Sequence, residues 1–381
     1  MGYLETSGDR RFMAEALRLA ARIACRPWPN PPVGAVVVRA GRIVGRGAHH
    51  GAGTDHAEVV ALRDADTLAR GSTLYCTLEP CNHEGRTPPC APLIAASGVA
   101  RVVAAIRDPN PGVAGGGLER VREAGVEVAL GVMAEEALET AWPFVCTGAF
   151  AQPFVLLKTA VSLDGRFAPP AGERTAGEPA YLTSLAARRE VHALRRWNDV
   201  VVVGEHTMAA DRPHLDGQLA GDAGTCPSLD PIPAYADTDL SLEGGWPRPF
   251  WVFAGAERAA DQARLGIERR GGTVVLCAER DGHVAPESLV AEFGRRGGHC
   301  LMVEGGPQLA AAFLDAGLVD RWVSYVAPTV LGSGPTWPER ESRGAFHLTR
   351  AGAAGPDARL VFDREPFHAV LADLAAPRGG R

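Results

Sequence analysis

The chain has 381 residues, which is long enough for two domains, and its hydrophobic fraction of 46% is typical of a folded protein. Its formal net charge is −6 and no block of Lys or Arg stands out, which argues against extended nucleic-acid binding. No apolar run approaches the roughly 18 residues that span a bilayer, so no membrane association is expected. The eight scattered cysteines indicate reduced thiols rather than a disulfide framework, and we expect a cytoplasmic protein.

The first half of the chain alternates helical and extended patterns. Apolar residues at helical spacing predict a helix over residues 11–24, after which prolines force an extended loop and residues 33–45 predict a hairpin. Further strands are expected at residues 72–76, 101–106 and 126–130, with helices from His56, from Cys90, near 118–124 and from Ala134. This alternation predicts an α/β layer whose sheet is largely parallel after the hairpin.

A second α/β pattern begins at Phe154, after a stretch rich in Pro and Gly at residues 142–153 that is expected to join two domains, 1–148 and 149–381. A helix ending at Arg196 is expected to be capped by Thr183 or Ser184. Residues 216–249 are rich in Gly, Pro, Asp and Ser, which predicts a long surface excursion, ordered or disordered. The other strands of this half are expected at residues 199–203, 250–253, 273–276, 300–303, 321–326 and 359–362.

One imidazole and two thiols in the first half form a candidate zinc site. His56, Cys81 and Cys90 suit Zn²⁺, and three protein ligands leave the fourth position open for water, as in catalytic sites. Glu58 follows His56 by two residues and is predicted to carry a proton without binding the metal, as in nucleobase deaminases. Eight residues separate the two cysteines where two are common. A closed zinc knuckle with His83 as fourth ligand, or cysteines that merely fill the core, are the alternatives, but Glu58 has no purpose in a knuckle.

The second half carries weaker signals of chemistry. A strand is followed by Gly305-Gly306 and by a helix that begins at Pro307, a pattern that suits a pyrophosphate but also fits an ordinary tight turn. Lys158 is the only lysine of the chain. Lys158 and Glu304 either face a common cleft or are solvated charges. No Gly-x-Gly-x-x-Gly follows a strand, which argues against a standard Rossmann domain.

Together these segments resemble the bifunctional RibD-type family of riboflavin biosynthesis, in which a pyrimidine deaminase is fused to a reductase. The block from Thr77 to Cys90 is the most specific match, and matching segments such as Ser162-Leu-Asp-Gly165 and Val303-Glu-Gly-Gly306 follow in the expected order. The resemblance implies a cytidine-deaminase-like three-layer domain, then a dihydrofolate-reductase-like domain, usually as a homo-oligomer. It implies Zn²⁺ and NADPH as cofactors. The substrates implied are 2,5-diamino-6-(5-phosphoribosylamino)-4(3H)-pyrimidinone, which is deaminated, and 5-amino-6-(5-phosphoribosylamino)uracil, whose ribosyl group is reduced to ribityl.

The same resemblance implies roles for individual residues. Glu58, Lys158 and Glu304 would be catalytic, and the deaminase substrate would contact Asn30, His49, His83, Arg86, Asp108 and Asn110. Arg195 and Leu215 would contact the reductase substrate, and the NADPH site would be lined by Val161, Tyr181, Thr207, Asp211, Gly305, Gly306 and Pro307.

The second half departs from the family pattern at several positions. The family usually has Trp at the position of Tyr181, Asp at that of Arg212 and Arg at that of Gln218, and residues 174–178 look inserted. A deaminase whose reductase-like domain has lost turnover is therefore the second hypothesis. A non-catalytic zinc-stabilised binding protein is a third, and a nucleic-acid-editing deaminase is disfavoured by the acidic charge.

Overall fold

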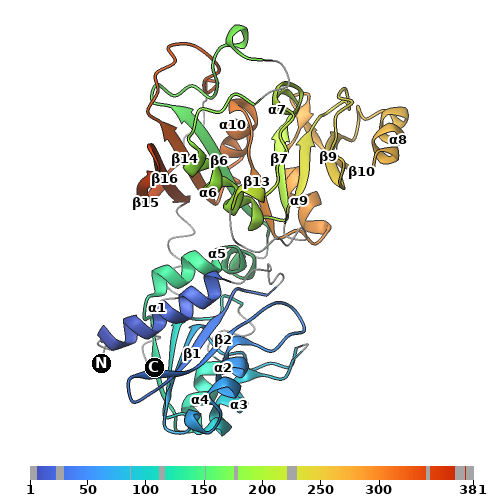
Figure 1. The fold of residues 1–381 in the computed structure, drawn as a ribbon. Coiled ribbons are helices and arrows are strands. Elements are labelled where there is room, and N and C mark those ends of the chain that lie inside the picture. Colours follow the sequence, from blue (N-terminus) through green and yellow to red (C-terminus); the bar gives the residue numbers. More distant parts are fainter. Residues whose placement is uncertain are drawn as a thin grey trace. The chain divides into compact units, whose positions relative to one another are not determined.

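The computed structural model describes residues 7–22, 30–85, 87–110, 116–150, 152–175, 179–220, 230–339 and 344–364, together with Leu374. The chain forms two compact units, one of residues 1–151 with 368–381 and the other of residues 152–367. Figure 1 shows both units and labels many of their helices and strands. Each unit has its own sheet and is described by itself.

The first unit is built on a five-stranded sheet with the order β2-β1-β3-β4-β5. Strand β1 is antiparallel to β2 and β3, whereas β3, β4 and β5 are parallel, so the expected hairpin followed by a parallel sheet is present. The elements in chain order are α1 (Ser7–Ala21), β1 (Gly34–Arg39), β2 (Arg42–Ala48), α2 (Ala57–Ala65), the 3₁₀ turn η1 (Asp66–Ala69), β3 (Thr73–Leu78), α3 (Cys90–Ser97), β4 (Arg101–Ile106), α4 (Gly116–Glu123), β5 (Glu127–Leu130) and α5 (Ala134–Phe150).

Helices cover both faces of this sheet, and glycines let two of them approach very closely. A Cβ atom on Gly34 would lie 2.0 Å from the carbonyl oxygen of Ala16 in α1. On β2, a Cβ on Gly45 would lie 2.2 Å from the oxygen of Ala61, and one on Gly47 would lie 2.0 Å from that of Ala57, both in α2. Helix α2 therefore rests directly on the backbone of β2, in a place where no other residue type fits.

The expected junction at residues 142–153 is wrong in its first part, because α5 continues to Phe150. Pro143 removes one backbone donor from the helix but does not end it. The neighbouring side chains of Trp142 and Val145 are buried, and their packing favours the helical path over an early exit.

The second unit is built on a nine-stranded sheet with the order β10-β9-β8-β7-β13-β6-β14-β16-β15. Neighbouring strands from β10 to β14 are parallel, and β14, β16 and β15 are antiparallel. Helices α9 and α10 share a core with the central strands. The elements in chain order are β6 (Phe154–Ser162), η2 (Ala171–Glu173), α6 (Leu185–Arg196), β7 (Val200–Gly204), α7 (Glu205–Asp211), η3 (Gln218–Ala220), β8 (Ile232–Ala236), β9 (Phe250–Gly255), α8 (Asp261–Arg269), β10 (Gly272–Cys277), β11 (Glu279–Arg280), β12 (His283–Val284), α9 (Pro286–Arg295), β13 (Cys300–Val303), α10 (Pro307–Asp315), β14 (Arg321–Ala327), β15 (Phe346–Ala354) and β16 (Asp357–Arg364).

The expected surface excursion at residues 216–249 is wrong, because β8 lies inside it. This strand pairs with β7 on one side and β9 on the other, and Tyr235 is fully buried. Its sequence, Ile-Pro-Ala-Tyr-Ala, contains a proline and two small residues, so its β-propensity is low and tertiary pairing decides its structure. Trp246 is also anchored, because its Nε1 donates to the carbonyl of Pro213 at 2.7 Å. Residues 221–229 lie outside the described part.

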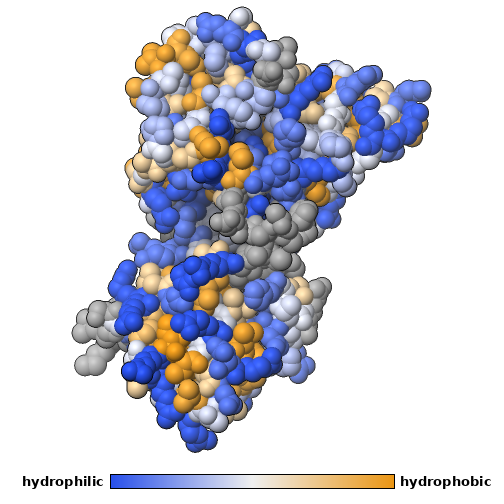
Figure 2. Space-filling view, in the orientation of Figure 1, coloured by the Kyte–Doolittle hydropathy of each residue, from blue (hydrophilic) through white to orange (hydrophobic). Residues whose placement is uncertain are grey.

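On the face drawn in Figure 2, hydrophobic residues form separate patches among hydrophilic ones. Of the helices in the described part of the chain, none combines the length and the apolar character needed to cross a bilayer.

Candidate active sites

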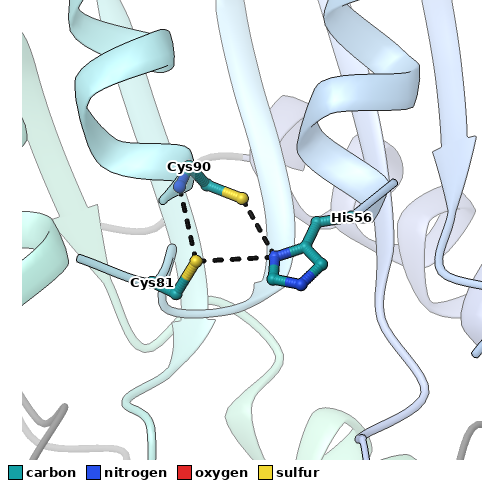
Figure 3. A group of neighbouring side chains, drawn as sticks. All are labelled: His56, Cys81 and Cys90. Atoms are coloured by element: carbon teal, nitrogen blue, oxygen red, sulfur yellow. Dashed lines mark hydrogen bonds between the residues drawn. The ribbon is translucent and has the colours of Figure 1, made fainter. Parts of the chain in front are cut away.

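Three potential metal ligands converge at the end of the first unit's sheet (Figure 3). His56 precedes α2, Cys90 is the first residue of α3, and Cys81 lies in the loop after β3. The Nδ1 atom of His56 is 3.1 Å from Cys90 Sγ and 3.5 Å from Cys81 Sγ. The ligand atoms of all three residues lie within 4.8 Å of one another, so one cation can reach all of them. His83 is outside this group among the described residues.

The protonation of the two thiols fits a cation site. The pKa of Cys81 is lowered to about 4, chiefly because the Cys90 thiol donates a hydrogen bond to its sulfur. The same contact and burial raise the pKa of Cys90. The backbone N–H of Cys90 also donates to Cys81 Sγ, at 3.3 Å. The site thus offers two sulfurs and one imidazole nitrogen that already lie within hydrogen-bond distance of one another. These are the donor atoms that zinc prefers.

The second nitrogen of His56 has its own partner, which motif reasoning missed. Thr87 Oγ1 lies 3.2 Å from His56 Nε2. When Nδ1 binds a metal ion, Nε2 carries the hydrogen and can donate it to the threonine hydroxyl. Such a contact fixes the tautomer and the orientation of a metal-binding histidine.

A cavity of about 300 Å³ opens in front of the three ligands. Glu58 lines it and is only 4% exposed, and burial raises the pKa of its carboxyl group to about 7. A carboxyl group that titrates near neutral pH is suited to accept and return a proton. The cavity is lined by Asn30, Pro31, Val33, His49, Ala52, Gly53, His56, Glu58, Leu78, Glu79, Cys81, His83, Gly85, Thr87, Asp108, Asn110 and Phe144.

Five of the six residues predicted to contact the deaminase substrate line this cavity: Asn30, His49, His83, Asp108 and Asn110. Asn30 Nδ2 is 2.8 Å from His49 Nε2, and His49 Nδ1 is 3.2 Å from the carbonyl oxygen of Asp55. His49 is therefore held on both sides, with Nδ1 as the donor to Asp55. Arg86, the sixth residue, lies outside the described part.

The second unit brings Lys158 and Glu304 together. Lys158 Nζ donates to Glu304 Oε1 at 3.2 Å. Arg195 binds the same carboxylate with two hydrogen bonds, from Nε to Oε2 at 2.8 Å and from Nη2 to Oε1 at 2.9 Å. Burial opposes the charge of Glu304, but Arg195 and Lys158 lower its pKa to about 2. A buried carboxylate is thus kept charged beside a mostly buried ammonium.

Close to this pair, the ends of β7 and β13 form a backbone cradle. The Gly306 N–H donates to Thr207 Oγ1 at 3.2 Å, and a Cβ on Gly305 would lie 3.1 Å from Leu309 Cδ2. Pro307 opens α10, and the first N–H groups of a helix have no partner within the helix and favour an anion. These residues fit a pyrophosphate.

The other residues predicted for the NADPH site differ in their surroundings. Val161 lies on β6 and is partly exposed. Tyr181 is 65% exposed, with the Arg188 guanidinium 4.3 Å from the centre of its ring. Asp211 accepts a hydrogen bond from Arg174, which belongs to the segment that looks inserted.

The two residues predicted to contact the reductase substrate are buried. Leu215 is 1% exposed and has a positive φ of 54°. Arg195 is also buried, and its Nη1 donates to the carbonyl oxygen of Asp216 at 3.0 Å. In contrast, Arg212 and Gln218, which differ from the family pattern, are exposed.

Known proteins share this architecture over nearly the whole chain. The profile of the cytidine and deoxycytidylate deaminase zinc-binding region matches residues 6–106, and that of the RibD C-terminal domain matches residues 153–360. The riboflavin biosynthesis protein RibD of Escherichia coli K12 is 37% identical over 347 residues, which cover 85% of this chain and 89% of that protein. The RibD of Bacillus amyloliquefaciens is 37% identical over 371 residues, 93% and 95% of the two chains. This chain belongs to the RibD family.

Solved RibD structures agree with this assignment. Acinetobacter baumannii RibD, form 1, superposes with a TM-score of 0.74 at 30% identity and covers 95% of this chain and all of that one. A Thermotoga maritima protein, described as a diaminohydroxyphosphoribosylaminopyrimidine deaminase/5-amino-6-(5-phosphoribosylamino)uracil reductase, gives a TM-score of 0.77 at 30% identity and covers 94% and 99% of the two chains.

The chain is therefore a bifunctional enzyme of riboflavin biosynthesis. As a RibD protein it combines a cytidine-deaminase-like zinc domain with a dihydrofolate-reductase-like domain that uses NADPH. The family resemblance and the fold class expected from the sequence are confirmed.

Proposed function

We propose that the first unit replaces the 2-amino group of 2,5-diamino-6-(5-phosphoribosylamino)-4(3H)-pyrimidinone by oxygen. The second unit then reduces the ribosyl group of 5-amino-6-(5-phosphoribosylamino)uracil to ribityl. The observation that supports this most is the meeting of His56, Cys81 and Cys90 beside buried Glu58 in one cavity. This arrangement has the parts of a hydrolytic deaminase, and it would be superfluous in a purely structural zinc site.

In the deamination, His56, Cys81 and Cys90 would hold Zn²⁺, which supplies Lewis-acid activation of water. Glu58 takes a proton from the attacking water and returns it to the departing amino group, which leaves as ammonia. Its burial limits competing exchange with bulk water. Asn30, fixed by its contact with His49, orients the pyrimidine ring together with Asp108 and Asn110.

In the reduction, NADPH held by the second unit would supply a hydride to C1′ of the ribosyl group. The C1′–O4′ bond breaks and the ring oxygen gains a proton, which gives an open ribityl chain. Lys158 holds the opening sugar by a hydrogen bond, and Glu304, which stays charged, orients the ammonium. Arg195, which binds both oxygens of Glu304, keeps the carboxylate directed at Lys158. Thr207, Gly305, Gly306 and Pro307 would hold the pyrophosphate of the cofactor.

We also propose that the chain works as a homo-oligomer in the cytoplasm and acts on small phosphorylated pyrimidines. The free thiols of Cys76 and Cys277, in addition to those of the two site cysteines, suit a reducing compartment. Light scattering during size-exclusion chromatography measures the oligomeric state.

One experiment tests both activities. The purified protein is incubated with the phosphorylated pyrimidinone, with and without NADPH, and the products are identified by mass spectrometry. Without NADPH, we expect ammonia and a product in which one amino nitrogen is replaced by oxygen. With NADPH, that product gains two hydrogens. Ammonia release without NADPH oxidation would instead support the hypothesis of a deaminase with an inactive reductase-like domain.

A further inference from the structure

Glu79 is a buried carboxylate to which the reaction above gives no role. It follows β3 directly and precedes the loop that carries Cys81. Its exposed fraction is 2%, although it lies at the wall of the deaminase cavity. It is not one of the three residues whose ligand atoms converge on the metal position.

The carboxylate of Glu79 receives hydrogen bonds from two separate segments. Oε2 accepts from the backbone N–H of Asp108 at 3.3 Å, in the loop after β4. Oε1 accepts from the backbone N–H of Leu118 at 3.2 Å, in the first turn of α4. That N–H has no partner within its own helix, and a negative charge there is favoured by the helix dipole. The backbone N–H of Glu79 also donates to the carbonyl oxygen of Ile106 at 2.9 Å. Glu79 therefore connects the end of β3 with the end of β4 and its following loop, and with the start of α4.

The packing around Glu79 leaves these segments little freedom to separate or approach. A Cβ on Gly117 would lie 1.6 Å from the carbonyl oxygen of Pro80, so α4 begins in direct contact with the loop that leads to Cys81. Asp108 in turn accepts a hydrogen bond from the Asn110 N–H at 2.9 Å through Oδ1. The positions of both cavity residues therefore depend on where Glu79 holds the Asp108 backbone.

We propose that Glu79 is a positioning residue of the deaminase, which sets the spacing between the Cys81 loop and the wall formed by Asp108 and Asn110. The substrate pyrimidine occupies the gap that this spacing defines. The inference rests on the proposed placement of the substrate against Asp108 and Asn110. Glu79 itself transfers no proton and binds no metal.

Glu79→Gln is the test, because glutamine has the same size but only one acceptor oxygen. Its NH₂ group must face one of the two backbone N–H groups, which leaves that donor without a partner. We expect KM for deamination to rise about tenfold, with kcat changed less than about threefold and zinc content unchanged. Hydrogen exchange of the Asp108 and Leu118 amides should accelerate, whereas that of the amides in β3 should not.

Asp64→Asn is the matched control. The exposed Asp64 carboxylate also accepts a backbone N–H, that of Arg46 at 2.8 Å, but it lies outside the cavity, so KM should stay unchanged. An unchanged KM in Glu79→Gln would overturn the proposal. So would a parallel loss of zinc, kcat and amide protection throughout the unit, because that pattern marks a general folding role.

Two further variants keep the result decisive. If Glu79→Gln is insoluble, Glu79→Asp replaces it, since the shorter carboxylate cannot reach both amides, and the same rise in KM is expected. Asp108→Asn separates this inference from the substrate placement. If Asp108→Asn leaves KM unchanged, the placement itself is wrong. If Asp108→Asn raises KM and Glu79→Gln does not, only the role of Glu79 is refuted.

Discussion

Lys158 and Glu304 are 146 positions apart in the chain, yet Lys158 Nζ lies 3.2 Å from Glu304 Oε1. The parallel register of β6 and β13 explains this contact. Val303 lies opposite Leu157, so the next residue of each strand is brought to the same level of the sheet. Arg195 then fixes the carboxylate from the other side.

Replacing Lys158 by arginine should abolish the reduction selectively. The charge is kept, but a broad planar guanidinium cannot take the place of a compact ammonium between Glu304 and the sugar. We expect NADPH oxidation with the deaminated intermediate to fall by about a hundredfold or more. Zinc content and ammonia release in the same sample serve as controls and should be unchanged. Near-normal NADPH oxidation would show that Lys158 is a structural charge only.

Glu58→Gln should retain zinc and lose deamination. The amide is isosteric with the carboxyl group but cannot carry the proton, so kcat for ammonia release should fall by about 10²–10⁴-fold. Glu84→Gln is the matched control, because Glu84 is exposed on the loop between the two cysteines. Metal analysis and an ammonia assay on both variants test this prediction. An active Glu58→Gln enzyme would refute the role of Glu58 as the proton carrier.

Thr87→Val should weaken zinc binding without removing a ligand. Valine keeps the shape of threonine but cannot accept the hydrogen of His56 Nε2. We expect the zinc dissociation constant, measured by competition with a chelator, to rise about tenfold. Thr87→Ser retains the hydroxyl and should bind zinc like the unmodified protein. Equal affinities in all three proteins would mean that the contact contributes nothing to the metal site.

The affinity of the deaminase for its substrate should depend on pH through Asp108. Burial raises the pKa of this carboxyl group to about 6. Only the charged form accepts hydrogen bonds from the pyrimidine with both oxygens, so substrate binding favours ionisation. KM for deamination should therefore fall as the pH rises through about 6 and level off above it. In Asp108→Asn this step should be absent, and its persistence there would assign it to another group.

Removal of zinc should separate the two activities. The metal ligands belong to one compact unit, whereas Lys158, Glu304 and the cofactor cradle belong to the other. Protein treated with a chelator should release no ammonia but still oxidise NADPH when given the deaminated intermediate, and added zinc should restore deamination. Loss of both activities on chelation would contradict independent centres.

The sequence was sufficient to predict the elements whose signal is local. The α/β pattern predicts β4 and β13 with their observed ends, and Ser184 caps α6 as expected, through a bond from the Ala187 N–H. The spacing of His56, Cys81 and Cys90 likewise predicts their convergence, because the first and last of them begin helices at the same edge of the sheet.

Features that depend on distant partners could not be predicted in this way. Strand β8 contains a proline and two alanines, so its β-propensity is too low for it to be recognised without its neighbours β7 and β9, and β15 is mostly exposed, so it shows no apolar alternation. The contacts of Thr87 and Glu79 depend on how loops are folded across the sheet. The two hydrogen bonds from Arg195 to Glu304 depend on the register of strands that are far apart in sequence.

The close packing of α2 against β2 limits which substitutions this enzyme can tolerate. The helix carries His56 and Glu58 at its start, and its height above the sheet is set by missing side chains at Gly45 and Gly47. A single methyl group at either position would lift the helix and carry the imidazole away from both sulfurs, although neither glycine lines the cavity. The deaminase thus has two vulnerable positions outside its cavity, and a substitution at either would be observed as a loss of metal affinity.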